Sequence, residues 1–158
     1  MKINLINLPL RNGVGIMVFN NNKKIFVGRR IDNQKAWQMP QGGVNDNESL
    51  KDAAFRELYE ETGIKSVKIV AESKQKYSYL LPKNLLGKIW KGKFKGQEQK
   101  WYLMKFFGED NEINLHQKHP EFCDWRWVKI SDLDKLIVSF KKNLYRDIIL
   151  EFKRFIYN

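Results

Sequence analysis

Apolar residues gather into short runs along most of the chain, and these runs predict β-strands. Residues 13–20 (GVGIMVFN) and 24–29 (KIFVGR) predict the two strands of a hairpin, because the asparagines at 20–22 between them favour a turn. Further strands are predicted at residues 67–71, 77–81, 99–107 and 120–128. The last of these contains alternating tryptophans, which indicate one buried face.

The C-terminal part of the chain has helical spacing instead. Residues 139–157 predict a long amphipathic helix, because apolar residues recur on one face every three or four positions. That stripe consists of Leu144, Ile148, Phe152 and Phe155. A shorter helix is predicted from residue 131, where Ser131 is a suitable N-cap. Together, the strands and helices indicate an α/β or α+β domain.

A third helix is predicted in the middle of the chain, and the sequence marks both of its ends. The helix begins near residues 48–49, where Asn47 or Ser49 is a suitable cap. It ends at Gly63, because glycine accepts the left-handed conformation that terminates helices.

The acidic residues of this helix fall on an unexpected face. Since an α-helix turns about 100° per residue, Glu57 and Glu61 lie about 40° apart, and Glu60 lies within about 100° of both. The apolar residues that the helix would bury project to the same side: Leu50, Ala53, Ala54 and Leu58. The sequence therefore predicts that the three carboxylates point toward the core rather than away from it.

Two interpretations of these carboxylates are open. A solvated acidic face is the ordinary one, but such a face lies opposite the apolar stripe, and here the two overlap. Carboxylates that cluster beside a core repel one another and lose hydration, so they need an arginine, a proton or a metal ion. Arg56 is expected to neutralise one glutamate and to leave at least two. The pattern favours a hard divalent cation, Mg²⁺ or Mn²⁺, with oxygen ligands.

Composition narrows the class of protein. A length of 158 residues with 42% hydrophobic content predicts one globular domain over residues 1–158. The net charge of +11 favours polyanionic partners. A single cysteine, Cys123, excludes an internal disulfide and fits a reducing compartment. No run is apolar enough for a signal or membrane segment, so we expect a cytoplasmic protein without a membrane partner.

The segment from Gly42 to Ile64, GGVNDNESLKDAAFRELYEETGI, resembles the signature sequence of the Nudix hydrolases. All nine defining positions are filled: Gly42, Glu48, Arg56, Glu57, Leu58, Glu60, Glu61, Gly63 and Ile64. The resemblance extends over nearly the whole chain and implies the α/β/α sandwich of that family, with a mixed central sheet. It also implies cleavage of a pyrophosphate bond in a nucleoside diphosphate derivative, with a divalent cation as cofactor.

Four further runs resemble one branch of the family, the bacterial RNA pyrophosphohydrolases and dinucleoside polyphosphate hydrolases. They are WQMPQGG at 37–43, QEQKW at 97–101, PEF at 120–122 and VSFKKNLYR at 138–146. The implied partner is an RNA 5′ end, whose triphosphate is converted to a monophosphate with release of pyrophosphate. A dinucleoside polyphosphate such as Ap4A is the alternative substrate, and a non-catalytic RNA- or nucleotide-binding module is the third interpretation. Oligomeric state and any protein activator stay open.

The resemblance implies metal-binding and catalytic roles for particular residues. Metal binding is expected at Gly42, Glu57, Glu60, Glu61 and Glu121, of which Glu121 lies in the PEF run. Catalytic roles are expected for Arg56, Glu57, Glu61 and Glu121. Arg56 would orient the glutamates by ion pairing, and the general base is either Glu57 or Glu121.

Substrate binding is expected from a wider set of side chains. Arg29 and Arg30 end a predicted strand, where paired arginines are ordinarily rim charges, but their planar guanidinium groups also match phosphate oxygens. Phe140 matches an aromatic residue that stacks on a substrate base in the branch. The complete expected set is Arg11, Arg29, Arg30, Gln41, Gln99, Lys100, Tyr102, Phe140 and Lys141.

A basic segment at residues 83–100 interrupts the strand pattern and has two interpretations. It interleaves Trp90 and Phe94 with lysines at 83, 88, 91, 93, 95 and 100. Such a mixture serves single-stranded RNA, whose phosphates attract the charges and whose bases stack on the rings. The alternative is a solvated loop whose aromatics fold back on the core. On an enzyme that cleaves phosphates, the lysines favour an RNA path.

Overall fold

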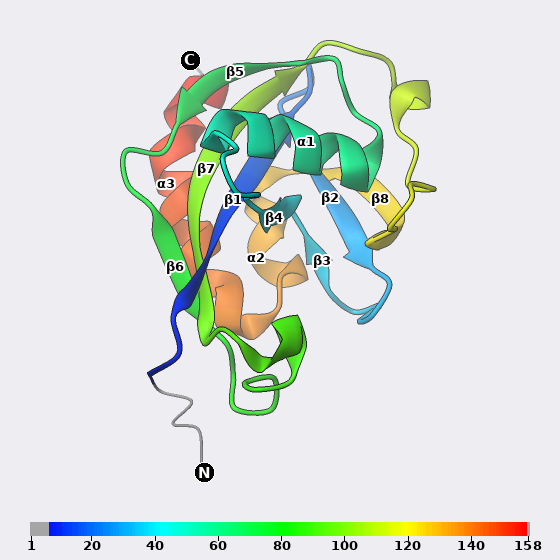
Figure 1. The fold of residues 1–158 in the computed structure, drawn as a ribbon. Coiled ribbons are helices and arrows are strands. Elements are labelled where there is room, and N and C mark those ends of the chain that lie inside the picture. Colours follow the sequence, from blue (N-terminus) through cyan, green and yellow to red (C-terminus); the bar gives the residue numbers. More distant parts are fainter. Residues whose placement is uncertain (1–6, 158) are drawn as a thin grey trace.

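A mixed β-sheet between two layers of helices is the frame of the computed structural model, which describes residues 7–157 (Figure 1). Its strands are β1 (Leu10–Phe19), β2 (Ile25–Arg30), β3 (Trp37–Gln38), β4 (Gln41–Gly43), β5 (Val67–Glu72), β6 (Tyr77–Leu80), β7 (Gly96–Phe106) and β8 (Phe122–Val128). The central order is β3-β2-β1-β7-β5, with β4 paired to β1, β6 to β7 and β8 to β2. Since β1 and β7 are parallel and the other pairs antiparallel, the predicted mixed sheet is confirmed.

Helices cover both faces of the sheet. They are α1 (Leu50–Thr62), α2 (Leu133–Leu136) and α3 (Lys142–Tyr157), with short 3₁₀ turns at Ile89–Gly92, Asp110–Glu112, Ile130–Asp132 and Ser139–Lys141. Helix α1 lies across one face, and α2 and α3 lie behind the other (Figure 1). Within residues 7–157, none of the helices combines the length and the apolar character needed to cross a bilayer.

Two apolar cores form because successive side chains of a strand point to opposite faces. Val14 and Ile16 of β1 belong to the core that contains Leu58 of α1. Met17, also from β1, belongs to the core that contains Ile148 of α3. The same central strand therefore supports both helical layers, and the predicted α/β/α sandwich is confirmed.

The ends of α1 follow from its sequence. The Ser49 hydroxyl accepts a hydrogen bond from the Asp52 N–H at 3.1 Å, so Ser49 is the N-cap. Gly63 ends the helix at φ 76°, and its N–H donates to the Tyr59 carbonyl at 2.8 Å. Asn47 precedes the cap at φ 63°, a left-handed conformation that asparagine tolerates better than most residues. Both predicted ends are confirmed.

The C-terminal helices differ from their predictions in two details. The apolar stripe of α3 continues from Phe152 to Ile156, which is 5% exposed, whereas Phe155 is 39% exposed, so its predicted place in the stripe is wrong. Ser131 lies inside the 3₁₀ turn Ile130–Asp132 and does not cap α2, which begins without any side-chain cap. The segment predicted as the first turn of the long helix, Ser139–Lys141, is a separate 3₁₀ turn.

The strand predictions missed two short elements, and they started both β1 and β7 three residues too late. Strands β3 and β4 have two and three residues, too few to produce a visible alternation. Strand β7 begins at Gly96, so the C-terminal part of the predicted irregular segment belongs to the sheet. Strand β4 matters most for the site, because its pairing to β1 places Gly42 opposite Val14, at the edge of the sheet next to α1.

Candidate active site

A cavity of about 920 Å³ brings together most of the residues that the sequence singled out. Its walls come from β1, β4 and α1, from the loop after β6, from the loop before β8 and from the start of the C-terminal helical region. The predicted residues that line it are Arg11, Arg30, Gln41, Gly42, Glu57, Glu60, Glu61, Glu121, Phe140 and Lys141. Carboxylates and cationic side chains therefore line the same open cavity.

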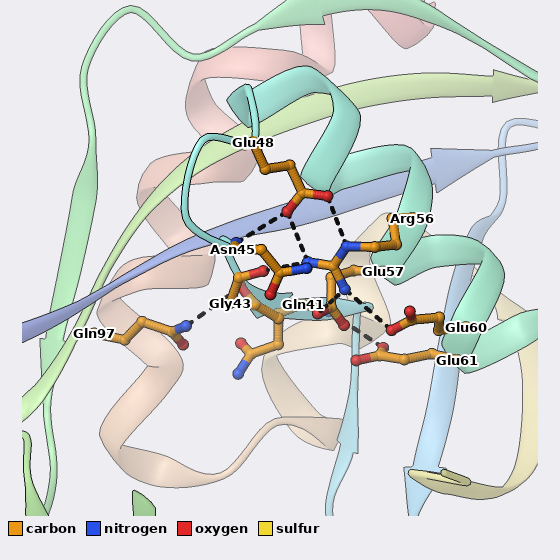
Figure 2. A network of polar contacts seen from close by, with 10 residues as sticks. Gln41, Gly43, Asn45, Glu48, Arg56, Glu57, Glu60, Glu61 and Gln97 are labelled. Atoms are coloured by element: carbon orange, nitrogen blue, oxygen red, sulfur yellow. Dashed lines mark hydrogen bonds and ion pairs between the residues drawn. The ribbon is translucent and has the colours of Figure 1, made fainter. Parts of the chain in front are cut away.

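Arg56 ties the carboxylates of α1 to the strand beside them (Figure 2). Its Nε donates to Glu48 at 2.7 Å, and its Nη1 donates to Glu57 at 2.8 Å and to Glu60 at 3.1 Å. Its Nη2 donates to the Gly43 carbonyl at 2.8 Å and again to Glu48 at 2.9 Å. Arg56 thus contacts three glutamates, but its single positive charge offsets only one of their negative charges. These hydrogen bonds raise the pKa of Arg56 and lower the pKa of Glu48.

Glu61 is the carboxylate that Arg56 does not reach. Its side chain is buried, with the residue 6% exposed, and it accepts a hydrogen bond from the Gln41 N–H at 3.4 Å. Within the described part of the chain, no lysine, arginine or histidine forms an ion pair with it. Burial raises the pKa of Glu61 well above its ordinary value, and the charges of Glu57 and Glu121 raise it further. A buried acid flanked by like charges is stabilised by a proton or a cation.

The other two acids that face Glu61 are also destabilised as anions. Burial raises the pKa of Glu57, although its hydrogen bond to Arg56 opposes the effect. Burial likewise raises the pKa of Glu121, which precedes β8, and Arg30 opposes that shift. The cavity thus contains one buried acid, Glu61, one partly buried acid, Glu57, and one more exposed acid, Glu121, and the pKa of each is raised.

Glu60 departs from its prediction. Its side chain is 55% exposed, against 15% for Glu57, so only Glu57 and Glu61 turn toward the core as the helical projection predicted. Across residues 7–157, no three acidic, histidine or cysteine side chains already converge on one point where an ion would sit. Instead, Glu57 and Glu60 both accept hydrogen bonds from Nη1 of Arg56.

The donor set nevertheless fits a hard divalent cation. Every candidate side-chain ligand offers a carboxylate oxygen, which is the ligand that Mg²⁺ and Mn²⁺ prefer. The buried, unpaired Glu61 supplies a negative charge that the protein itself does not neutralise. Gly42 is important because it has no side chain. A Cβ at this position would overlap the carboxyl group of Glu57. Glycine therefore lets β4 lie directly against that carboxylate.

A network of buried amides supports the strand that holds Gln41. Gln99 donates to Gln41 at 3.2 Å and to Gln97 at 2.9 Å, and Gln97 accepts a second hydrogen bond from the Tyr79 hydroxyl at 3.0 Å. Gln97 in turn donates to the Gly42 carbonyl at 3.4 Å (Figure 2). Gln99 lies beneath Gln41 and does not line the cavity, so the structure places it as a support for that residue.

Sequence reasoning missed Gln97 and Tyr79, although a pattern pointed to them. Gln97 and Gln99 alternate with Trp101 along β7, and alternating positions of a strand share one face. Two buried glutamines on one face of a central strand require hydrogen-bond partners. Tyr79 supplies one of these from the neighbouring strand β6, and it also lines the cavity.

A cationic end of the cavity is built around Gln38. The Nη1 of Arg30 and the Nζ of Lys141 both donate to Oε1 of Gln38, at 3.1 and 3.2 Å. Arg30 also pairs with Asp32 at 2.7 Å. Lys141 is 2% exposed, and burial lowers its pKa to about 7, with the charge of Arg30 acting in the same direction. Phe140 lies next to this group, with its ring 5.8 Å from the ring of Tyr79.

Besides Gln99, three residues from the expected substrate-binding set lie outside the cavity. Arg29 packs over the ring of Trp37 at 5.7 Å. Lys100 lies 3.8 Å from Glu72, and Tyr102 is 2% exposed in the core under α1. The two β7 residues alternate with Gln99 and Trp101, so they face the opposite side of the sheet from the amide network.

Comparison with known proteins agrees with this geometry. The NUDIX domain matches residues 9–148. An RNA pyrophosphohydrolase of Pelagibacter ubique is 56% identical over 149 residues, which cover 94% of each chain. An RNA pyrophosphohydrolase of Sphingopyxis alaskensis is 51% identical over 148 residues, which cover 92% of this chain and 94% of the other.

A solved structure with the same fold is the dihydroneopterin triphosphate pyrophosphohydrolase of E. coli. It superposes with a TM-score of 0.71 over 92% of this chain and 99% of its own, at 16% identity, a likeness that concerns the fold alone. The domain match and the two RNA pyrophosphohydrolases show the family as well as the fold. Because they extend over nearly all of the sequence, including every glutamate of the cavity, the chain belongs to the NUDIX domain family.

Proposed function

We propose that this protein is a divalent-cation-dependent RNA pyrophosphohydrolase that converts the 5′-triphosphate end of RNA to a 5′-monophosphate and releases pyrophosphate. The observation that carries the proposal is the cavity itself, in which the carboxylates of α1 and the cations Arg30 and Lys141 face the same space. Cleavage of a triphosphate end requires carboxylates to hold a divalent cation and cationic side chains to neutralise the phosphate oxygens. Relatives that are 51–56% identical over more than nine-tenths of their length carry the same name, which supports the choice.

A divalent cation, Mg²⁺ or Mn²⁺, would be held by Glu57, Glu60 and Glu61, with Glu121 and the carbonyl of Gly42 as further oxygen donors. When bound, it would neutralise phosphate oxygens and lower the pKa of a water molecule. Arg56 binds one oxygen each of Glu57 and Glu60, so the second oxygen of each carboxylate would be available to the cation. Arg56 would then act as a positioning residue that remains anchored to Glu48 and the Gly43 carbonyl.

The remaining chemistry belongs to the side chains of the cavity. Phosphoanhydrides resist hydrolysis because their negative oxygens repel an attacking hydroxide, so cationic groups must surround them. Arg11, Arg30 and Lys141 line the cavity and would supply such groups. Either Glu57 or Glu121 accepts the proton of the attacking water, since both line the cavity and burial raises the pKa of both. Phe140 offers an aromatic ring beside the cationic end.

The experiment that tests the proposal compares two substrates. The purified protein with Mg²⁺ is given triphosphate-ended RNA and, in parallel, Ap4A, and kcat/KM is measured for each. We expect the RNA to be the better substrate and pyrophosphate to be its released product. If RNA were untouched while Ap4A turned over efficiently, the protein would be a dinucleoside polyphosphate hydrolase instead.

A non-catalytic binding module on the same fold is the alternative from another class. Binding alone does not need the three carboxylates of α1, and all three are present. Glu57→Gln keeps the shape of the side chain and removes its charge, so we expect kcat to fall about 10²–10⁴-fold. Glu109→Gln changes an exposed acid outside the cavity and serves as the matched control. Product release by Glu57→Gln at the rate of the control would favour the binding module.

A further inference from the structure

The loop between β6 and β7 is strongly and uniformly basic. We call residues 82–95 the lysine loop. It contains five lysines, and no acidic residue occurs between positions 82 and 97. Four of these lysines are exposed, and the fifth is partly buried. The members are Lys83, Lys88, Lys91, Lys93 and Lys95.

The lysine loop forms part of the wall of the cavity. Leu85, Ile89 and Trp90 line the cavity from within the loop, and Lys88 and Lys91 directly flank the last two in the chain. The base of the loop is closed by a hydrogen bond from the Leu81 N–H to the Lys95 carbonyl at 2.8 Å. In Figure 1 the loop (green) extends below the ends of β6 and β7. Its charges therefore border the site that would hold the RNA 5′ end.

The aromatic residues of the lysine loop pack against the protein. The guanidinium of Arg11 lies over the ring of Trp90 at 5.2 Å, and Phe94 makes an edge contact with that ring at 6.2 Å between centroids. Both rings are partly buried. Of the two interpretations of the basic segment, the structure therefore shows the one in which the aromatic rings fold back on the protein. The exposed surface of the loop thus offers positive charge rather than stacking platforms.

These lysines also lack acidic partners. In the described part of the chain, the lysines that pair with carboxylates within 4 Å are Lys51, Lys76 and Lys100, and all three lie outside the loop. Like charges held close together repel one another, and a polyanion that binds them releases condensed counterions. A strand of phosphates is therefore the ligand whose chemistry fits this surface best.

We infer that the lysine loop binds the backbone phosphates of RNA nucleotides that follow the 5′ end held in the cavity. This inference rests on the proposed function, and it adds a second contact region for the same substrate. Because the rings are packed away, the contact is independent of base sequence. A substrate of only two nucleotides is too short to reach the lysine loop. Longer RNA therefore gains in kcat/KM, and that gain is sensitive to salt.

The test uses a triple variant, K83Q/K88Q/K93Q, and two triphosphate-ended substrates, a dinucleotide and an RNA of about twenty nucleotides. Lys91 is left unchanged because its backbone is left-handed, with φ 58°. At low salt we expect kcat/KM for the longer RNA to fall about tenfold, within the range of electrostatic steering. The dinucleotide should be unaffected. The slope of log kcat/KM against log salt should flatten by about 0.7 for each phosphate that the variant no longer neutralises.

The matched control is K68Q/K129Q/K153Q, which removes the same charge from exposed lysines that do not line the cavity. Equal losses of kcat/KM in both triple variants would mean a general charge effect and would overturn the inference. So would an unchanged rate on the longer RNA, which is the result expected if the loop serves a protein partner. Failure of the parent protein to act on either substrate would instead overturn the proposed function.

A second measurement applies if the triple variant does not fold. In the parent protein, the salt dependence of kcat/KM should be steeper for the longer RNA than for the dinucleotide, because more phosphates are neutralised. Equal slopes for the two substrates would contradict a contact at the lysine loop.

Discussion

Two buried charged residues of opposite sign define the candidate site at the level of single side chains. Glu61 is 6% exposed and Lys141 is 2% exposed, and neither has an ion-pair partner among the described residues. Burying such groups is unfavourable unless a ligand compensates them. Their presence in one cavity is consistent with a ligand that carries both a cation and phosphate oxygens. Buried charged residues of this kind lower the free energy of unfolding, and they are kept where the function needs them.

Lys141→Met is expected to stabilise the fold and impair the reaction. Burial lowers the pKa of Lys141 to about 7 from 10.5, so below pH 7 the folded protein carries the full cost of a buried charge. Between pH 7 and 10.5 the unfolded chain binds the extra proton, so the stability of the parent rises with pH, by up to about 1.4 kcal/mol per unit. Methionine removes the charge, and Arg30 still donates to Gln38.

Denaturant unfolding at several pH values measures this difference. The variant should exceed the parent by about 2–5 kcal/mol at pH 6, and the gap should close toward pH 10. Its kcat/KM for triphosphate-ended RNA should fall. A variant that is less stable than the parent at pH 6 would show that Lys141 is not a strained buried charge.

The contact between α1 and β4 sets the geometry of the carboxylates at the level of elements. Gly42→Ala would drive its Cβ into the carboxyl group of Glu57. We expect kcat/KM to fall about 10²-fold, because a displacement of about 1 Å is enough to disrupt a catalytic arrangement. The overlap should also destabilise the fold by about 1–3 kcal/mol.

A double-mutant cycle identifies the cause of that effect. In a Glu57→Ala background the side chain that obstructs the new Cβ is absent, so Gly42→Ala should then cost almost no stability. An equal cost in both backgrounds would mean that strain in β4, rather than contact with Glu57, explains the effect.

The same elements show what local sequence can predict. Ser49 and Gly63 mark the ends of α1 because a cap and a left-handed residue act within one turn of the chain. Strands β3 and β4 escaped prediction because two and three residues are too few to show an alternation, and their pairing with β2 and β1 is what makes them strands. Phe155 was misplaced because a stripe at mixed spacing of three and four allows two continuations, and packing selects Ile156.

At the scale of the whole molecule, a buried hydroxyl links the helix layer behind the sheet to the segment between β3 and β4. Tyr145 of α3 accepts a hydrogen bond from the Met39 N–H at 2.7 Å, between β3 and β4. Tyr145→Phe leaves that buried N–H without its partner, and we expect the free energy of unfolding to fall by about 1–3 kcal/mol. Tyr157→Phe on the same helix, where the side chain is exposed, is the control and should change little. Equal effects of the two substitutions would contradict the assigned role.

At this scale the sequence predicted the carboxylates but not their partners. The spacing in α1 and the resemblance to a family identified Glu57, Glu60 and Glu61. Alternation along β7 places Gln97 and Gln99 on one face, but the pairing of β6 with β7 and of β4 with β1 brings the groups that they bind, and alternation does not specify this pairing. Lys100 and Tyr102 were expected at the substrate but lie on the opposite face of β7, and Gln99 and Arg29 do not line the cavity either.

Locating the cation tests the proposed function most directly. Crystals grown with Mn²⁺ and a triphosphate-ended dinucleotide would be measured for anomalous scattering. We predict a manganese peak about 2.1 Å from carboxylate oxygens of Glu57, Glu60 or Glu61. A cavity that binds the dinucleotide without any manganese peak would contradict the cation-dependent mechanism.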